Sequence, residues 1–261
     1  MLVATLIAAA AVAQDTNLVE RAAIVRPGVW LPRLGGTIQD GGAKLDLETD
    51  IFLRDREATF LGEFELRPVD HLTLEVSTFD FSVSNSGTFS GNTTFGGMAL
   101  RNGDLWSGTI EMQSVGIEAS WDMVRPYPRG GDTMLTFAPL LGAQWYGVDV
   151  DLRNATTGTS VTRDESWEFL YGGARMDLGW DTSEHVQWLD SLSIDAAAGV
   201  GSLVGGDGGT GWMVRVGMAF EFAANTSLYF GYRLRELNAE SGSYTFDAGL
   251  QGLFIGGQIR F

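Results

Sequence analysis

The sequence contains no cysteine, which excludes disulfide bonds, thiolate chemistry and cysteine-ligated metal centres. It has only two histidines, His71 and His185, and only six prolines. It also lacks a run of about 20 consecutive apolar residues, the length that a membrane-spanning helix needs. We therefore expect neither transmembrane helices nor cysteine-based chemistry.

Basic residues are few, with 17 Lys and Arg against 33 Asp and Glu, and the formal net charge is −16. Because clustered Lys and Arg are what hold a phosphate backbone, we expect no nucleic-acid partner. The acidic excess suits a solvated surface that resists self-association. The length of 261 residues allows one large all-β domain or two small ones.

The first thirteen residues are apolar and end in Ala11-Val12-Ala13, a small-residue cleavage pattern. We interpret residues 1–13 as a secretory signal peptide, with a short buried helix as the alternative. No Lys or Arg precedes the apolar stretch, so the natural start could lie upstream of Met1. Residues 14–26 are then expected to form a periplasmic N-terminal segment.

The rest of the chain alternates between apolar and polar residues with a period of two, which indicates β-strands. Between Trp212 and Phe222, for example, every second residue is apolar, while Arg215 and Glu221 lie on the other face. About ten such segments occur, although eight or twelve strands are also possible. They span approximately 28–39, 58–67, 71–83, 106–124, 133–151, 165–181, 188–203, 211–222, 227–238 and 244–261.

The final strand shows the same pattern, with Leu253, Ile255, Ile259 and Phe261 on one face. We expect it to pair with the first strand, near residues 29–39, and so to close a barrel over residues 27–261.

The connections alternate in length, with 40–57, 84–105 and 152–164 predicted as long loops. In outer-membrane barrels, the long loops lie outside the cell and both termini face the periplasm. Aromatic residues near the strand ends are consistent with interfacial girdles. We expect one girdle at Trp121, Phe137, Trp180, Trp188, Phe220, Phe222 and Phe261 and the other at Trp106, Trp145, Trp167, Trp212, Tyr232 and Tyr244.

In the alternating parts of the fourth and the sixth to tenth strands, no charge falls on the apolar face, as expected if that face contacts lipid, where an Arg or Lys at the midplane costs about 2–4 kcal/mol. A soluble sandwich that buries the apolar face is the alternative. The expected lumen charges are Glu63, Glu65, Glu75, Glu118, Asp122, Asp177, Asp195 and Glu221 with Arg67, Arg175, Arg215, Arg233, Arg235 and Arg260.

On these features the chain resembles the single-chain outer-membrane β-barrel proteins of Gram-negative bacteria. The resemblance covers the signal-like start and residues 27–261, and its most specific part is the C-terminal assembly signal at Gly256, Ile259 and Phe261. Phe254 departs from the family, which usually has a polar residue there. The resemblance implies periplasmic export, periplasmic chaperones, insertion by the outer-membrane assembly machinery and contact with outer-membrane lipid, but no particular activity.

Outer-membrane enzymes of similar size use His with Ser, Asp or Glu at the outer rim, and neither histidine of this chain is expected there. Adjacent residues such as Ser183, Glu184 and His185 rarely meet at one reacting centre, so we predict no catalytic residues and no cofactor.

Asp46, Glu48 and Asp50 alternate in an acidic loop. On a strand they would share a face and could bind Ca²⁺ or Mg²⁺, although a solvated loop is the simpler interpretation.

The lumen could be a narrow pore for water or small solutes, or an interior sealed by ion pairs. A barrel of eight strands is just filled by side chains, whereas open channels occur at sixteen to eighteen strands. Inward Gly and Ala residues make room either for Arg side chains or for water. We predict a non-enzymatic all-β barrel with a structural or surface-interaction role, acidic extracellular loops and a mostly filled lumen, and a porin-like pore as the alternative.

Overall fold

The computed structural model describes residues 23–51, 53, 55–69, 71–123, 133–182, 186, 188–223 and 225–261. The predicted signal peptide, residues 14–22, the turn at 125–131 and His185 lie outside this range. No helix in the described residues is long and apolar enough to cross a membrane. The strands are β1 (Ala23–Asp40), β2 (Leu45–Asp46), β3 (Thr59–Val69), β4 (Leu72–Thr88), β5 (Thr93–Phe95), β6 (Met98–Leu100), β7 (Leu105–Trp121), β8 (Thr133–Asn154), β9 (Thr159–Asp181), β10 (Ser191–Val204), β11 (Gly208–Ala223), β12 (Thr226–Ser241) and β13 (Tyr244–Arg260).

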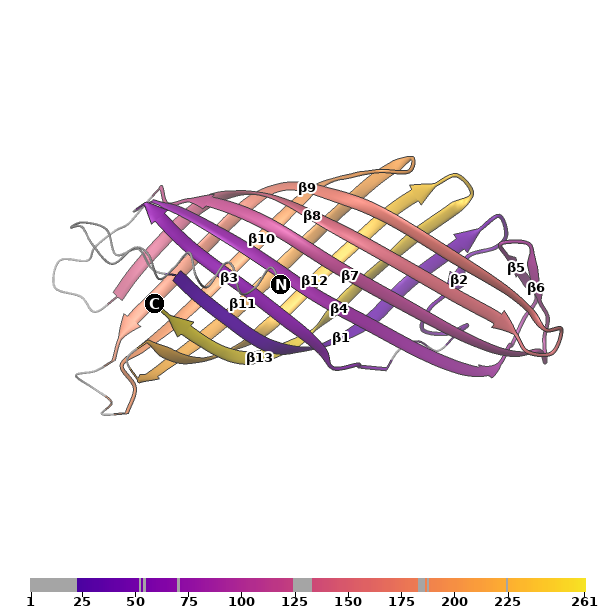
Figure 1. The fold of residues 1–261 in the computed structure, drawn as a ribbon, viewed down its shortest axis with the longest axis horizontal. Coiled ribbons are helices and arrows are strands. Elements are labelled where there is room, and N and C mark those ends of the chain that lie inside the picture. The colour runs from indigo at the N-terminus through magenta and orange to yellow at the C-terminus, as the bar shows by residue number, and fades with distance from the viewer. Residues whose placement is uncertain are drawn as a thin grey trace.

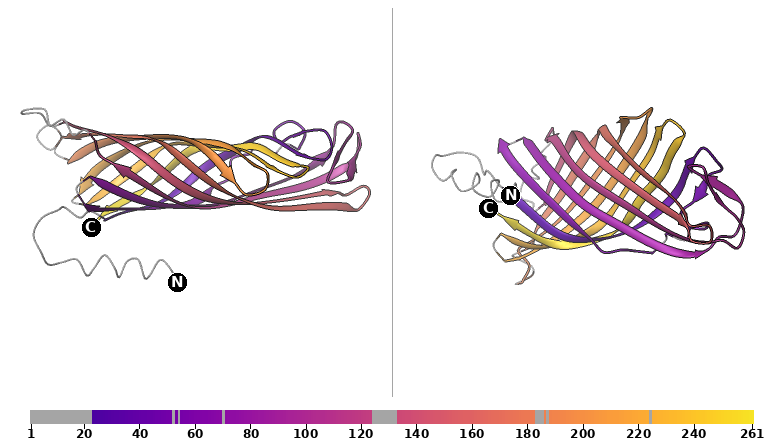
Figure 2. Two further views of the ribbon diagram at one scale, coloured as in Figure 1. Left: turned by 90° about the horizontal axis from the view of Figure 1, so that it is seen from above. Right: turned by 45° about the vertical axis from the view of Figure 1, so that its right-hand side comes forward.

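Ten of these strands form a closed antiparallel barrel. Each long strand pairs with the next long strand along the chain, and β13 pairs back with β1 from Ile24↔Arg260 to Asp40↔Tyr244. The prediction of about ten strands closed by the first and last is therefore confirmed. Figures 1 and 2 show the strands tilted around an elongated barrel, with β2, β5 and β6 at the end opposite the C-terminus. We call this the distal end, and the other the C-terminal end.

The first strand begins at Ala23, four residues before the predicted boundary at residue 27. Arg26, assigned by the sequence to a periplasmic segment, is therefore part of the barrel wall. The sequence was hard to interpret here because two prolines interrupt the strand. Pro32 lies just beyond Trp30↔Thr59, the last β1–β3 pair, so its missing N–H falls where β1 no longer pairs with β3.

Several predicted connections are shorter in the structure, because the strands continue past their predicted ends. The expected long loop at 152–164 is incorrect: β8 runs to Asn154, β9 starts at Thr159, and only residues 155–158 connect them. The long connections at the distal end are 41–58, which contains β2, and 89–104, which contains β5 and β6. The predicted alternation of loop lengths therefore holds only in part.

In the C-terminal half of the barrel, the buried charged residues lie on the face predicted to point inward, and the apolar residues of the other face are exposed. The outward face there is an exposed apolar belt that no soluble core covers, as expected of a surface that contacts lipid. Its members include Val29, Phe60, Val76, Val115, Ile117, Leu141, Leu170, Met176, Val200, Val216, Leu228, Phe230, Leu253 and Ile255.

The distal half of the barrel has the opposite polarity. Its interior is packed with apolar residues, while its outer wall carries charged and polar ones. Along β8, for example, Val150 and Leu152 are buried inside, whereas Asp151 and Arg153 face outward. The strands thus extend beyond the lipid-facing belt into a region where water surrounds the barrel. This inversion explains why the sequence pattern misplaced the strand ends.

The predicted aromatic girdles are partly incorrect for the same reason. At the C-terminal end, Trp121, Phe137, Trp188, Phe222 and Phe261 are exposed as expected. At the other edge of the belt, Trp145, Trp212 and Tyr232 are exposed on the outer surface. Trp106, Trp167 and Tyr244 instead lie inside the distal core, where Trp167 stacks on Tyr244 at 6.4 Å between ring centroids.

Candidate functional site

Three glutamates form the centre of the lumen within the apolar belt. Glu63 and Glu65 point inward from β3, Glu75 points inward from the neighbouring β4, and all three are buried. Their inward direction follows from the strand period of two, which places Phe60, Phe64 and Leu66 on the opposite face.

Four buried arginines from across the barrel converge on these glutamates. Arg26 donates to Glu65 at 2.9 Å, and Arg175 donates to the same Glu65 oxygen, Oε2, at 3.2 Å. A carboxylate removed from water needs such partners, because an unpaired buried charge is strongly destabilising. These contacts connect β3 with β1 and with β9.

The other two arginines, Arg215 of β11 and Arg233 of β12, complete the cluster. Arg215 donates to Glu75 at 3.1 Å and lies 3.5 Å from Glu63, while Arg233 donates to Glu63. Arg26, Arg175, Arg215 and Arg233 with Glu63, Glu65 and Glu75 are hereafter the lumen network. Six strands contribute to it, so it joins opposite walls of the barrel.

Two predicted lumen charges, Arg235 and Glu118, lie just distal to this network without an ion-pair partner among the described salt bridges. Arg235 donates to the Tyr146 hydroxyl at 2.9 Å and to the Gln144 side chain. Glu118 accepts a hydrogen bond from the Tyr171 hydroxyl at 3.2 Å. The hydrogen-bond partners of these two charges are therefore neutral side chains.

The remaining predicted lumen residues lie toward the C-terminal end. Asp177 pairs with Arg175 at 2.9 Å, and Asp195 lies 3.5 Å from Arg215. Glu221 and Arg260 are 3.9 Å apart at the mouth of the barrel. Asp122 follows the end of β7, where its backbone N–H donates to the His71 carbonyl.

Arg26 is the functional candidate that sequence reasoning missed. It makes three of the lumen contacts, to Glu65, Glu63 and Glu75, and also donates to Gln258 of β13 at 2.8 Å. The signal was present, since Ile24, Arg26, Gly28 and Trp30 alternate with Val25, Val29 and Leu31.

Neighbouring side chains fill the space beside two of the inward glycines, Gly199 and Gly116. A Cβ at Gly199 would lie 2.8 Å from the Tyr171 ring, and one at Gly116 would lie 3.0 Å from the Gln144 side chain. The cavity between the network and Tyr171 has a volume of about 10 Å³, room for roughly one water molecule. The sequence alone allowed either water or side chains to fill the space beside the inward glycines. At these two positions, side chains fill it.

Each end of the lumen has a different character. A recess of about 700 Å³ opens at the C-terminal end, with Ser191, Glu221, Gln258 and Arg260 among its lining residues. The distal end is filled by the apolar core. Leu45, Leu47, Phe95, Met98 and Leu100 from β2, β5, β6 and their flanking turns are buried within that core.

Buried polar residues fasten the distal loops onto the barrel. Asp40 accepts hydrogen bonds from Arg163 at 2.6 Å and from Ser243 at 2.8 Å. Asn154 donates to the Ala99 carbonyl at 3.0 Å and to Asp104 at 2.8 Å. The distal loops are therefore part of the folded core.

The three weak metal candidates do not share a strand face. Asp46 ends β2, and Glu48 and Asp50 lie in the turn that follows. Asp46 accepts hydrogen bonds from the backbone N–H groups of Glu48 and Thr49, both at 2.8 Å, and Glu48 pairs with Arg33 at 2.6 Å. Among the described residues, no group of three or more His, Asp or Glu side chains is arranged to hold a metal ion.

His71 lies at the C-terminal end, next to the Trp121 ring at 6.0 Å between centroids. His71 therefore lies at the opposite end of the barrel from the distal rim. Its neighbour is a girdle residue, which fits an interfacial position.

A row of outward carboxylates marks the polar wall of the distal half. Glu111, Asp149 and Asp164 are direct register partners on β7, β8 and β9. Partial burial, together with the neighbouring carboxylates of Asp164 and Asp151, raises the pKa of Asp149. Such a row could not face lipid, so it lies beyond the membrane belt.

Neither a family model nor a curated protein matches the sequence. The fold is similar to that of the outer membrane protease OmpT of Escherichia coli, with a TM-score of 0.58 and 8% identity over 95% of this chain and 99% of that one. Weaker structural matches include Ail of Yersinia pestis (TM-score 0.39, 11% identity, 93% of this chain and 100% of that one) and the Neisserial surface protein A (TM-score 0.40, 11% identity, 92% and 99%). The closed barrel and its lipid-facing belt define the chain as an outer-membrane β-barrel protein.

Proposed function

We propose that the protein is a non-enzymatic, sealed outer-membrane barrel, which exposes its distal end outside the cell in a structural or surface-interaction role. The observation that supports this most directly is the lumen network, because buried ion pairs from six strands cross the interior. The apolar core of the distal half adds a second barrier, since an ion would have to pass through it without water.

Export through a cleaved signal at residues 1–13 and insertion through Gly256, Ile259 and Phe261 belong to the same proposal. Gly256 allows close approach of the first strand, because a Cβ there would lie 2.8 Å from the Gly28 Cα. Ile259 and Phe261 are exposed on the outer surface, where an assembly factor could contact them. The acidic outer wall of the distal half favours a surface partner with basic groups.

Single-channel recording in planar bilayers tests the sealed lumen. We expect the wild-type protein to give no steady conductance steps, because charges and apolar side chains occlude the path. Steady steps that change in Arg233→Ala or Arg235→Ala would show that ions pass these side chains and would establish the porin-like alternative. Heat-modifiable migration on gels confirms in each case that the protein under study is a folded barrel.

A further inference from the structure

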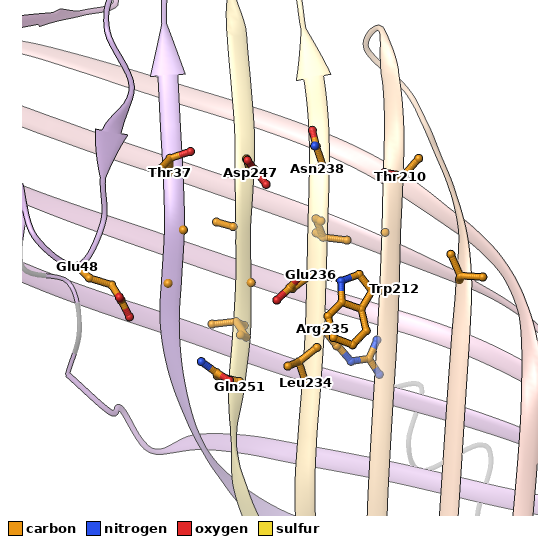
Figure 3. Close-up of a pocket in the computed structure, with 18 residues that line it drawn as sticks. Thr37, Glu48, Thr210, Trp212, Leu234, Arg235, Glu236, Asn238, Asp247 and Gln251 are labelled. Atoms are coloured by element: carbon orange, nitrogen blue, oxygen red, sulfur yellow. Dashed lines mark hydrogen bonds between the residues drawn. The ribbon is translucent and has the colours of Figure 1, made fainter.

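A recess of about 570 Å³ lies in the outer wall of the barrel, separate from the lumen (Figure 3). It spans β1, β13, β12 and β11. Its centre is the register pair Gly35↔Gly249, where two adjacent strands carry no side chain on the outer face. The wall is low at this point, and longer side chains lean over it: the Glu236 side chain lies 2.7 Å from where a Cβ of Gly249 would be.

A polar row borders the recess on its distal side. Thr37, Asp247, Asn238 and Thr210 are successive register partners across the four strands, and Figure 3 shows them at one level. On the opposite side lie Leu234 and Gln251, which are also register partners. One edge thus offers hydroxyl, carboxylate and amide groups, and the other is partly apolar.

The two ends of the recess are also built differently. At one end, Trp212 is 41% exposed, and its indole N–H donates to Glu236 at 2.6 Å, which orients the ring. At the other end, Glu48 lies over Gly35, with its carboxylate 3.1 Å from where a Cβ would be. An aromatic face and a set of hydrogen-bonding groups therefore line the same recess.

The charges around the recess are largely compensated. Arg33 pairs with Glu48 at 2.6 Å, and Lys44 lies 3.8 Å from Asp247. This leaves two charged lining residues. The Glu236 carboxylate is already bonded to Trp212, and the Arg235 side chain donates to Gln144 and Tyr146 in the lumen. A neutral ligand with many hydroxyl groups suits such a lining better than a free ion does, because donors and acceptors are plentiful and net charge is small.

The position of the recess along the barrel, relative to the lipid-facing belt, also favours a ligand with hydroxyl groups. Leu31↔Leu253 is an apolar pair of the lipid-facing belt, and Gly35↔Gly249 lies two alternate positions farther along the same strands. At about 3.4 Å per residue, this places the recess centre roughly 14 Å along the strands beyond that pair. Trp212, which lines the recess, is one of the exposed aromatic residues at the edge of the belt, so we place the recess opening at the level of the lipid headgroups.

We propose that this recess binds a saccharide, with an apolar sugar face against Trp212 and hydroxyl groups on the polar row. Trp suits this role because a large flat apolar surface is held rigidly beside polar groups. The sugar could belong to a glycolipid of the surrounding leaflet or to a free oligosaccharide. The site lies outside the lumen, so the proposal holds whether or not the lumen conducts.

Calorimetric titration of the folded protein in detergent tests the site with three probes. These are a purified rough-type lipooligosaccharide, the oligosaccharide released from it by mild acid, and the lipid A that remains. We expect Trp212→Ala to weaken saccharide binding at least tenfold. Trp145→Ala is the matched control, because Trp145 is also 41% exposed on the outer wall, but on β8 away from the recess. Asn238→Ala provides a second variant that leaves the aromatic residue in place.

If both sugar-bearing probes bind, and Trp212→Ala and Asn238→Ala weaken binding while Trp145→Ala does not, the site recognises the saccharide without the lipid. Binding of the intact glycolipid alone, with the same variant pattern, would support a glycolipid source. The proposal is overturned if neither sugar-bearing probe binds, if lipid A binds as tightly as the intact glycolipid, or if the recess variants behave like the control.

Discussion

Glu65 has no exposed side-chain surface and contacts three arginines, Arg26, Arg175 and Arg67, at 2.9, 3.2 and 3.0 Å. Such a buried cluster is not in itself evidence of stability, because removing charges from water costs about as much as their attraction returns. The loss of one member is different, since it leaves its partners buried with excess positive charge.

We therefore expect Glu65→Gln to lower the free energy of unfolding by about 3–5 kcal/mol, as measured by equilibrium denaturation of the refolded barrel. Lys44→Ala is the control, because the Lys44–Asp247 pair is exposed and should contribute at most about 1 kcal/mol. Similar small losses in both variants would mean that the lumen network is solvated and not buried.

At the scale of the elements, the β8–β9 hairpin shows how a strand keeps its period while its environment changes. Near the C-terminal end its outward residues, such as Leu141 and Leu170, belong to the apolar belt. Beyond Trp145 and Glu168 the outward residues are polar, and the inward ones, such as Val148 and Leu152, are buried and apolar. The hairpin therefore contributes to both the charged lumen near the C-terminal end and the apolar core of the distal half.

Leu152 lies inside the distal core, so Leu152→Ala should destabilise the barrel by about 2–5 kcal/mol through lost burial and the cavity left behind. The adjacent Arg153→Ala faces outward and should change stability by no more than about 0.5 kcal/mol. Urea-induced unfolding of both proteins in the same detergent gives the comparison. If Leu152→Ala were neutral, residues 152–164 would behave as the solvated loop that the sequence first suggested.

At the scale of the whole molecule, the inversion of polarity defines where lipid ends. The outward residues of β9 change from Met176 and Leu170 to Glu168 and Asp164 within a few positions. Because a charged outward side chain is costly in the hydrocarbon layer, the distal half of the barrel must stand in water.

Single-cysteine labelling tests this arrangement directly, since the chain has no native cysteine. On intact cells, Asp164→Cys should react with a membrane-impermeant maleimide, whereas Met176→Cys, outward on the same strand, should be protected by lipid. Equal labelling of the two would contradict a lipid-covered belt. Labelling of Asp164→Cys only after the outer membrane is opened would reverse the proposed orientation.

Sequence reasoning worked where one physical rule dominated. Alternation in the belt identified the strands and placed Glu63, Glu65, Arg175, Arg215 and Arg233 on the inner face, because lipid tolerates only apolar side chains outside. The same rule failed in β1, where Pro27 and Pro32 obscure the pattern and Arg26 was missed. It also failed in the distal half of the barrel. The strands there have a polar outer face, so a search for apolar lipid-facing residues did not recognise them as strands.

The sequence by itself determined the class of fold and, within the belt and outside β1, the side of the strands that faces lipid, because both follow from a period of two and the cost of charge in a membrane. Only the tertiary structure decided which arginine meets which glutamate, that the distal interior is apolar, and that Gly35 and Gly249 meet in a recess beside Trp212. These features depend on register between strands that are distant in sequence, and no local pattern encodes which residues such pairing brings together.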